Sequence, residues 1–298
     1  MKKCGFITIL GAPNAGKSTL TNCIVGTKVS IVTHKVQTTR QKILGITIYD
    51  NAQIILIDTP GIFKAKRKLD RAMVNAAYSS SKDADIVFVM FDVTKSIKSK
   101  SYKETIEILD NVNHKHICLI LNKIDQVDKG SLLSIVELFE EYTHIKKIFM
   151  ISALKADGVM DLKAYAHENV SEGPWLFPED DITDMPKKLW ASEITREQVF
   201  RQLHQELPYD IFVETENFEY FENGDLKINQ VIYVAKMSQK GIVLGHKGAQ
   251  VKRISKNSRE EISLYLNCKV HLFLHVKVKE NWAEKPSIFQ QMNLDINS

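Results

Sequence analysis

Residues 11–18 read Gly-Ala-Pro-Asn-Ala-Gly-Lys-Ser, between an apolar run at 6–10 and a segment with helical spacing. The pattern GxxxxGK[ST] between a strand and a helix is a phosphate-binding loop. Its glycines let backbone N–H groups curl around phosphates, and the helix N-terminus adds positive charge. We expect Lys17 to act on the β- and γ-phosphates and the Ser18 hydroxyl to ligate Mg²⁺. The predicted nucleotide-binding residues of this loop are Gly11, Asn14, Ala15, Gly16, Lys17, Ser18 and Thr19.

Around this loop, short apolar runs alternate with segments of helical spacing from Phe6 to about Glu172. Most of the apolar runs are continuous, which is typical of strands buried on both faces of a parallel sheet. The alternation predicts an α/β domain with a doubly wound, mostly parallel sheet. The predicted strands are residues 6–10, 43–49, 53–57, 86–91, 117–121 and 147–151, and helical spacing is clear at 103–111 and 131–142.

A second motif, Asp-Thr-Pro-Gly, follows the predicted strand at 53–57. Asp58 lies where a strand ends facing the phosphates, which suits a carboxylate that holds Mg²⁺. The Gly61 N–H can contact a γ-phosphate and report its loss. We include Thr59 among the nucleotide-binding residues.

A third motif, Asn-Lys-Ile-Asp, closes the strand at 117–121 and selects the base. Asp125 can accept hydrogen bonds from the ring N–H and the amino group of guanine, a donor pair that adenine lacks. The stem of Lys123 can lie along the base, and Asn122 can tie this loop to the phosphate loop. Together with Ser-Ala at 152–153, these residues indicate GTP rather than ATP.

Ser152 and Ala153 end the next predicted strand, where the Ala153 N–H can meet the guanine oxygen. The remaining element is the sequence Gln-Thr-Thr-Arg at 37–40, in the loop before the strand at 43–49. A threonine here can ligate Mg²⁺ and order the loop only when GTP is bound. We favour Thr39, and Thr38 stays open as the alternative. The predicted metal ligands are therefore Ser18, Thr39 and Asp58, and the predicted catalytic residues are Lys17, Thr39 and Gly61.

The composition changes near residue 173, where prolines punctuate an acidic run. Such a stretch predicts an interdomain linker. We expect a GTPase domain at 1–173, a linker at 174–188 and a second domain with a C-terminal tail at 189–298. The second domain is a small α+β unit of helix, hairpin, two helices and a strand. Its predicted elements are residues 192–206, 211–221, 226–237, 242–244, 249–266 and 269–278.

The second domain concentrates positive charge around the sequence Gly-His-Lys-Gly at 245–248. Residues 236–279 hold ten lysines and arginines against two glutamates, a local formal charge of +8, while the whole chain carries +4. Charge gathered on one element is typical of phosphate binding. Two glycines permit a phosphate to approach closely, and the histidine and lysine between them supply donors and charge. The residues predicted to contact phosphate are Gly245, His246, Lys247, Gly248, Lys252 and Arg253, and the family resemblance described below implies that the phosphate is that of RNA.

The bulk properties exclude some classes of protein. No apolar stretch approaches the roughly 20 residues of a membrane span. The four cysteines are scattered, without a CxxC pair, which indicates free thiols in a reducing compartment. We expect a cytoplasmic protein.

Over almost its whole length the chain resembles the Era family of GTPases. GAPNAGKSTL, VQTTR, DTPG, NKID and ISAL resemble the GTPase half of that family, and FPEDDITD, SEITREQVF, GHKG and VKVKENW resemble its second half. The resemblance implies GTP hydrolysis to GDP and phosphate with Mg²⁺, and a type II KH domain whose GxxG loop clamps single-stranded RNA. It further implies binding near the 3′ end of small-subunit ribosomal RNA and a role in small-subunit assembly. Asn14 resembles an asparagine that helps to hold K⁺ in relatives.

One position departs from Ras-type switches, because Ile62 stands where those proteins have a water-orienting glutamine. Water positioning must then come from elsewhere. Three functional interpretations remain: a GTPase switch that gates RNA or ribosome binding, an RNA-binding protein that uses GTP structurally, and a peripheral switch at the inner face of the cytoplasmic membrane. The GxxG loop favours RNA over lipid. We expect a monomer with no DNA partner.

Overall fold

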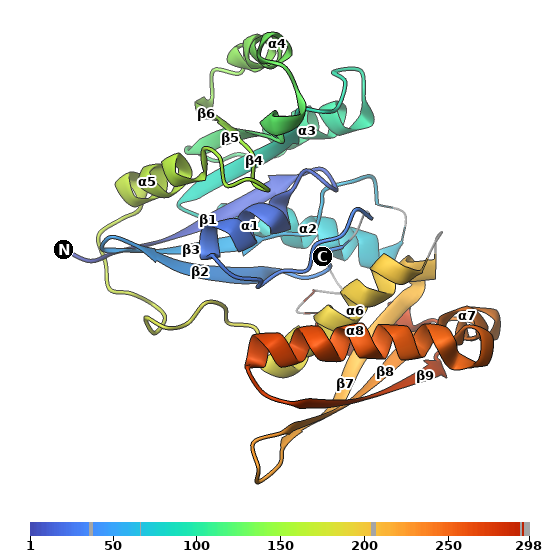
Figure 1. The fold of residues 1–298 in the computed structure, drawn as a ribbon. Coiled ribbons are helices and arrows are strands. Elements are labelled where there is room, and N and C mark those ends of the chain that lie inside the picture. The colour runs from blue at the N-terminus through green and yellow to red at the C-terminus, as the bar shows by residue number, and fades with distance from the viewer. Residues whose placement is uncertain (36–37, 66, 204–206, 293, 295–298) are drawn as a thin grey trace. The chain divides into compact units, whose positions relative to one another are not determined.

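The chain forms two compact units (Figure 1). The computed structural model describes residues 1–35, 38–65, 67–203, 207–292 and 294. The first unit comprises Met1–Asp184 together with the residues from Gln290 on, and the second comprises Met185–Phe289. The boundary between Asp184 and Met185 falls inside the stretch predicted as a linker. The described residues from Gln290 on, predicted to belong to the second domain and its tail at 189–298, group with the first unit.

The first unit is built on a six-stranded sheet in the order β2-β3-β1-β4-β5-β6. All neighbouring strands are parallel except the antiparallel pair β2 and β3. The mostly parallel sheet predicted from the continuous apolar runs is therefore confirmed. The strands are β1 (Lys3–Gly11), β2 (Ile43–Tyr49), β3 (Ala52–Asp58), β4 (Ile86–Asp92), β5 (Ile117–Asn122) and β6 (Ile145–Ile151).

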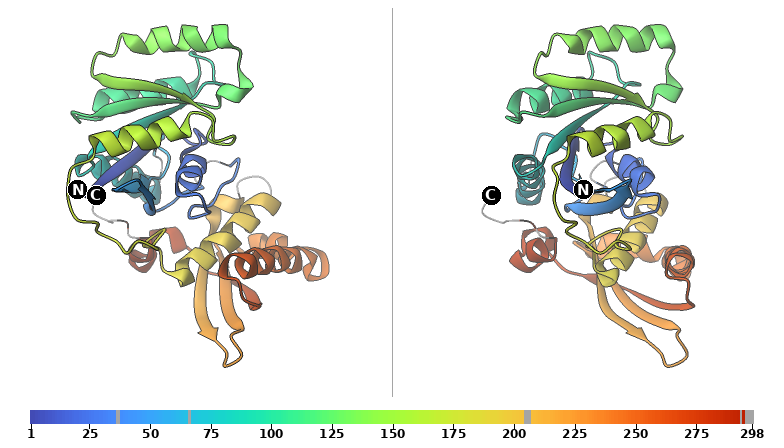
Figure 2. Two further views of the ribbon diagram at one scale, coloured as in Figure 1. Left: turned by 60° about the vertical axis from the view of Figure 1, so that its left-hand side comes forward. Right: turned by 90° about the vertical axis from the view of Figure 1, so that its left-hand side faces the viewer.

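Helices cover both faces of this sheet (Figure 2). One apolar core joins α1 and α5 to the sheet, and a second joins α2, α3 and α4 to the opposite face. The central strand β4 serves both, because Phe88 belongs to the first core and Phe91 to the second. The helices are α1 (Lys17–Val25), α2 (Lys68–Lys82), α3 (Lys100–Asn111), α4 (Lys129–Glu140) and α5 (Val159–Asn169).

Residues 174–184, here called the strap, follow α5 and are held by the buried side chain of Gln53 on β3. The Oε1 atom of Gln53 accepts hydrogen bonds from the backbone N–H groups of Leu176 at 2.9 Å and Phe177 at 3.0 Å. Its Nε2 atom donates to the carbonyl of Phe177 at 2.9 Å. The amide side chain thus pairs with the strap much as a neighbouring strand would.

The strap also covers part of an exposed sheet edge. β2 is an edge strand, and unpaired N–H groups on such a strand invite pairing with other chains. The Ile46 N–H donates to the carbonyl of Ile182 at 2.8 Å. The indole N–H of Trp175 donates to the carbonyl of Asn51 at 3.2 Å, at the turn between β2 and β3. The acidic segment that composition marks as a linker is therefore part of the first unit up to Asp184.

The second unit has a three-stranded sheet in the order β7-β8-β9, with β7 antiparallel and β9 parallel to β8. Its core joins α6, α7 and α8 to the sheet through residues such as Val199, Val243 and Ile254. The predicted order of helix, hairpin, two helices and strand is confirmed. The elements are α6 (Lys187–Gln202), β7 (Ile211–Tyr220), β8 (Leu226–Val234), α7 (Met237–Leu244), α8 (Ala249–Leu266) and β9 (Val270–Val278), with α9 (Pro286–Gln291) after them.

Several predicted boundaries in this unit are wrong. The first helix, expected to begin at residue 192, begins at Lys187, and the helix expected at 242–244 begins at Met237. The strand expected to reach Met237 ends at Val234, and Met237 is the first residue of α7. The reason is local: the side chain of Gln239 accepts hydrogen bonds from the N–H groups of Ala235 and Lys236, each at 2.9 Å, and so caps the helix. The first helix, expected to reach residue 206, ends at Gln202, because Leu203 already has extended backbone. Residue 206 itself lies outside the described residues. Within the described parts of the chain, every helix is too short or too polar to cross a lipid bilayer.

Candidate functional site

A cavity of about 490 Å³ lies at the carboxyl ends of the strands of the first sheet. Ligands of open α/β sheets bind at this edge, and the volume is within the usual range of ligand pockets. The predicted phosphate loop, the switch loop and the base-binding motifs all contribute to its lining. The predicted residues that line it are Asn14, Gly16, Lys17, Ser18, Thr19, Thr39, Gly61, Asn122, Lys123, Ser152 and Ala153.

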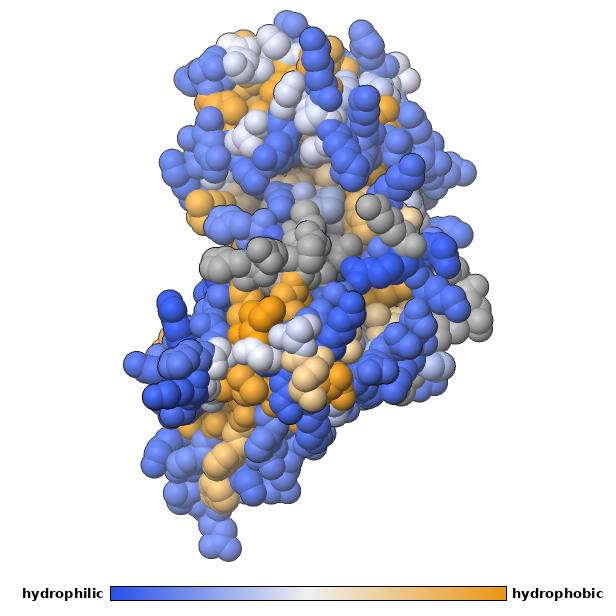
Figure 3. Space-filling view, turned by 90° about the vertical axis from the view of Figure 1, so that its right-hand side faces the viewer, coloured by the Kyte–Doolittle hydropathy of each residue, from blue (hydrophilic) through white to orange (hydrophobic). Residues whose placement is uncertain are grey.

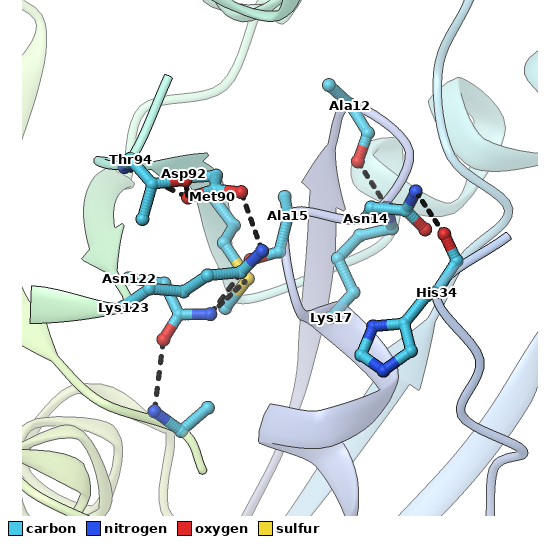
Figure 4. Close-up of polar contacts among 11 residues, drawn as sticks. Ala12, Asn14, Ala15, Lys17, His34, Met90, Asp92, Thr94, Asn122 and Lys123 are labelled. Atoms are coloured by element: carbon cyan, nitrogen blue, oxygen red, sulfur yellow. Dashed lines mark hydrogen bonds and ion pairs between the residues drawn. The ribbon is translucent and has the colours of Figure 1, made fainter. Parts of the chain in front are cut away.

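The phosphate loop is shaped by one glycine and one lysine. Gly16 has φ 106°, and an added Cβ would lie 2.2 Å from Nδ2 of Asn122, so glycine is required here. Lys17 donates from Nζ to the carbonyl of Ala12 at 3.0 Å (Figure 4). It also donates to the carbonyl of Gly11 at 3.0 Å. Burial lowers the pKa of Lys17 to about 8, although nearby carboxylates oppose the shift. A bound phosphate would favour the charged amine, as the predicted role requires.

The three predicted metal ligands come together in the structure. Ser18 Oγ donates to Asp58 Oδ2 at 2.7 Å and lies 2.9 Å from Oγ1 of Thr39. The other oxygen of Asp58 is buried without a hydrogen-bond partner, and burial raises the pKa of this carboxyl against the hydrogen bond from Ser18. Two hydroxyls and a carboxylate are hard oxygen ligands, so the set fits Mg²⁺. Ser18 and Thr39 would hold the ion, with Asp58 behind them.

The structure distinguishes the two candidate threonines. Thr39 is 6% exposed and its hydroxyl faces Ser18. The Thr38 hydroxyl instead donates to the carbonyl of Lys35 at 2.7 Å, within its own loop. This geometry favours Thr39 as the metal ligand. The described residues contain no cluster of three or more acidic, histidine or cysteine side chains that could hold an ion instead.

Asn122 ties the loops of the base side together, as predicted. Its Nδ2 atom donates to the carbonyl of Ala15 at 2.8 Å, and its Oδ1 atom accepts from the N–H of Ala153 at 3.0 Å. In the structure the Ala153 N–H is bonded to Asn122, and its contact with the guanine oxygen stays a prediction. That N–H already has a protein partner, so Ala153 first serves to hold its loop against β5.

Asp125 follows β5 in the short helix η1 (Ile124–Gln126). Its Oδ1 atom is buried and has no hydrogen-bond partner, while Oδ2 lies 3.9 Å from Nζ of Lys155. A buried acceptor without a donor is costly, and a guanine ring would supply the missing donors. The geometry therefore supports the predicted role of Asp125 in base recognition, although this residue does not itself line the cavity.

Two residues of the DTPG region turn away from the cavity. The Thr59 hydroxyl donates to the carbonyl of Ile9 at 2.6 Å and is fully buried, so this side chain anchors the motif to β1 instead of facing a nucleotide. Ile62 is 6% exposed and packs in the core beneath α2 and α3. It cannot orient a water molecule. Gly61, in contrast, approaches the phosphate loop so closely that an added Cβ would lie 3.0 Å from Pro13.

Part of the cavity wall was not predicted. Residues 31–34, Asp92, Lys95 and Leu154 also line it. The segment 31–34 carries no motif, so the sequence offered no signal for it. Asp92 ends β4, and the rule that sites form at the carboxyl ends of parallel strands could have identified it.

In the second unit, the loop between α7 and α8 contains two glycines, Gly245 and Gly248, whose surroundings differ. Gly245 has φ 70°, and an added Cβ would lie 2.6 Å from Cβ of Gln250, so packing alone demands glycine there. Gly248 has φ 77°, and an added Cβ would meet nothing within 4 Å. The loop therefore presents an open backbone surface at Gly248, flanked by the exposed side chains of His246 and Lys247.

Positive charge and apolar surface meet beside this loop. Lys247, Lys252 and Arg253 are exposed, and α8 starts directly after the loop with no side chain capping its first N–H groups. On α7, Met237 and Ile242 are 71% and 57% exposed. Figure 3, viewed from the side on which α7 lies, shows apolar surface on this unit. Cations with open N–H groups suit a sugar-phosphate backbone, and apolar side chains suit bases.

Comparison with known proteins identifies the family. Residues 6–123 match a family described as 50S ribosome-binding GTPase, and residues 206–283 match the KH domain family. GTPase Era of Brucella suis biovar 1 (strain 1330) is 51% identical over 293 residues, which cover 98% of this chain and 94% of that protein. The chain belongs to the Era family of GTPases. It is accordingly an enzyme that hydrolyses GTP.

Solved Era structures have the same fold. A crystal structure of Era in complex with MgGDPNP and nucleotides 1506–1542 of 16S ribosomal RNA gives a TM-score of 0.91 at 36% identity, covering 98% of this chain and 99% of that one. A variant of Aquifex aeolicus Era bound to GDP·AlF₄⁻ gives 0.90 at 36% identity, covering 97% and 98%. The predicted fold, a P-loop GTPase domain followed by a KH domain, is confirmed for this Era-family chain.

Proposed function

We propose that this Era-family GTPase is a switch whose KH domain binds small-subunit ribosomal RNA near its 3′ end and which acts in small-subunit assembly. The observation that carries the proposal is the open, basic loop at 245–248 beside exposed apolar side chains, in a chain with a complete guanine-nucleotide site. The relative crystallised with nucleotides 1506–1542 of 16S ribosomal RNA supports the choice of RNA. The match to a 50S-binding family covers the GTPase half alone and does not concern the KH domain.

In this switch, each nucleotide contact has an assigned residue. Lys17 stabilises charge on the β- and γ-phosphates, Ser18 and Thr39 hold Mg²⁺, and the Gly61 N–H senses the γ-phosphate. Asp125 reads guanine. Because the Ile62 side chain is buried in the core, hydrolysis relies on groups other than a glutamine to position water. Loss of the γ-phosphate releases the Thr39 and Gly61 loops, which is the event that changes RNA affinity.

The decisive test is binding to RNA from the 3′ end of the organism's own small-subunit ribosomal RNA. We expect the GTP-loaded full chain to bind a labelled fragment of that region at least about tenfold more tightly than a scrambled fragment, about 1.4 kcal/mol. Fluorescence anisotropy gives both affinities. Equal affinity for the two fragments would contradict sequence-specific binding. Turnover measured with and without small subunits separates a true switch from an RNA-binding protein that uses GTP structurally.

The same assay addresses the remaining expectations on partners. We propose a monomer that needs no DNA, and peripheral attachment at the inner membrane surface is the alternative role of the basic surface. Anionic vesicles added in place of RNA test this alternative. Binding to vesicles but not to RNA would favour the membrane switch, and light scattering of the free chain gives its oligomeric state.

Potassium is a further proposed cofactor, placed near the β/γ bridge by Asn14. This residue is exposed, stands at φ 64°, and donates from Nδ2 to the carbonyl of His34 at 2.9 Å, which links the phosphate loop to the loop at 31–34. We expect severalfold faster turnover in K⁺ than in Na⁺ at equal ionic strength, because K⁺ would add positive charge where the transition state gains negative charge. Identical rates in the two salts would refute the proposal, and Asn14→Ala should abolish any difference.

A further inference from the structure

Asp92 is a buried carboxylate at the nucleotide cavity to which none of the roles above refers. It ends β4, is 1% exposed and lies in register with Asn122 of the neighbouring strand. Its Oδ1 atom accepts hydrogen bonds from the N–H and the hydroxyl of Thr94, at 3.0 and 2.7 Å. Its Oδ2 atom accepts from Nζ of Lys123 at 2.6 Å (Figure 4). Both oxygens are therefore committed, and the orientation of the carboxylate is fixed.

Lys123 is held at both ends of its side chain. Its backbone stands in the left-handed region, at φ 71° and ψ 34°, which a residue other than glycine adopts only where its surroundings impose it. Its ammonium group ends at Asp92, and both residues line the cavity. A lysine side chain in water samples many rotamers, whereas one fixed at both ends presents its apolar stem in one place.

The ion pair between Asp92 and Lys123 also fixes the position of the Lys123 charge. The Asp92 carboxylate takes the Lys123 ammonium, so this charge is neutralised within the base side of the cavity. The other cavity lysine of the predicted motifs, Lys17, is held by carbonyls of the phosphate loop. The two cations thus have separate tasks, one at the phosphates and one beside the base.

We propose that Asp92 is a positioning residue for the nucleotide: it anchors the Lys123 ammonium so that the lysine stem forms a fixed apolar surface for the guanine ring. This inference rests on the proposed role of Lys123 in base binding. It predicts that Asp92 affects nucleotide affinity without affecting the hydrolysis step. Contact with the ring face is also independent of the groups that Asp125 reads, so losses for GDP and for other purine diphosphates should be alike.

Asp92→Asn is the informative substitution, because it removes the acceptor for the Lys123 ammonium and keeps the acceptor for Thr94. The amide oxygen can still accept from Thr94, while the amide N–H₂ then faces the lysine ammonium as a second donor. The lysine loses its anchor although the strand end stays packed. We expect GDP affinity to fall about five- to tenfold, measured with a fluorescent GDP analogue on the full chain. The KM for GTP should rise by a similar factor while kcat stays near that of the parent chain.

A double-mutant cycle tests whether Asp92 acts through Lys123. Lys123→Met keeps the apolar stem but removes the ammonium, and it should weaken GDP about as much as Asp92→Asn does. If the residues act as a pair, the double variant will be no weaker than either single variant. Additive losses, or full GDP affinity in Asp92→Asn, would overturn the proposal. Asp128→Asn, a matched change of an exposed carboxylate that caps α4, should leave GDP affinity unchanged.

Two further measurements, the GDP affinity of Thr94→Val and the RNA affinity of all the variants, show whether a loss of GDP affinity comes from the positioning role of Asp92. If Asp92→Asn folds poorly, Thr94→Val removes one of the two orienting bonds at Oδ1, and it should weaken GDP about twofold with the fold intact. Unchanged GDP affinity in that variant would contradict the positioning role. RNA affinity measured at saturating GTP should stay normal in all these variants. A loss of GDP affinity with normal RNA binding supports the inference, whereas failure of the parent chain to bind RNA concerns the proposed function alone.

Discussion

Asp125→Asn is expected to lower GTP affinity at least about a hundredfold and to make XTP the preferred nucleotide. The Oδ1 atom of Asp125 is buried without a partner, so the protein holds an acceptor ready for the ring N–H and amino group of guanine. An asparagine places an N–H₂ donor in the same position. That donor repels the guanine amino group but matches the carbonyl oxygen that xanthine has there.

Competition against a labelled guanine nucleotide measures both affinities on one preparation. Asp128→Asn is the matched control, because it makes the same chemical change three residues later at an exposed cap. Its GTP and XTP affinities should equal those of the parent chain. If Asp125→Asn keeps full GTP affinity and gains none for XTP, the base is read by other groups and the assignment is wrong.

Gly248→Asp is expected to weaken RNA binding by more than tenfold, each tenfold being about 1.4 kcal/mol. An added Cβ at Gly248 meets nothing within 4 Å, so the protein itself accommodates the side chain. The space it enters is the space in which an RNA phosphate would approach the loop. The aspartate therefore obstructs that phosphate and also repels it, since like charges at close range are unfavourable.

Gly248→Asn separates the two effects. Asparagine has nearly the shape of aspartate and also tolerates the left-handed conformation at φ 77°, but it carries no charge. We expect its loss of RNA affinity to be smaller than that of Gly248→Asp, and the gap should narrow at high salt. Circular dichroism must show a folded second domain in both variants.

GTP affinity and intrinsic turnover should stay near normal in both Gly248 variants, because the nucleotide residues belong to the first unit. Unaltered RNA binding in a folded Gly248→Asp chain would refute the assignment of the KH loop. A fall in GTP affinity with unchanged RNA binding would also contradict the assignment of the KH loop, because it would show that this loop serves the nucleotide site.

The parts of the fold that could be predicted are those whose signal is local. Continuous apolar runs identified the six strands of the first sheet, and the strand-loop-helix context identified the phosphate loop at 11–18. Motif spacing predicted that Ser18 and Asp58 would meet a switch threonine, but only the structure distinguished Thr39 from Thr38. These features depend on hydrophobic periodicity and on where parallel strands end, and both can be recognised in the amino-acid sequence.

The parts that could not be predicted depend on long-range hydrogen bonds. Nothing in the sequence Asp-Thr-Pro-Gly shows that Thr59 bonds to the carbonyl of Ile9 on another strand, or that Asn122 takes the Ala153 N–H. Likewise, the acidic, proline-rich composition of residues 174–184 predicts a linker because the buried partner, Gln53, lies far away in sequence. The composition of this segment does not show the contacts that hold it, which are the bonds to Gln53, Ile46 and Asn51.

The strap decides where the GTPase unit can be cut from the rest of the chain. A chain cut after residue 173 would lose the three hydrogen bonds between Gln53 and the strap, each with a net contribution of about 0.5–1.5 kcal/mol. A chain ended after Asp184 keeps all three. Between the strap and α6 stand Met185 and Pro186, and the proline ring fixes φ at −56°. A GTPase unit prepared on its own should therefore end at or after Asp184 and not at residue 173.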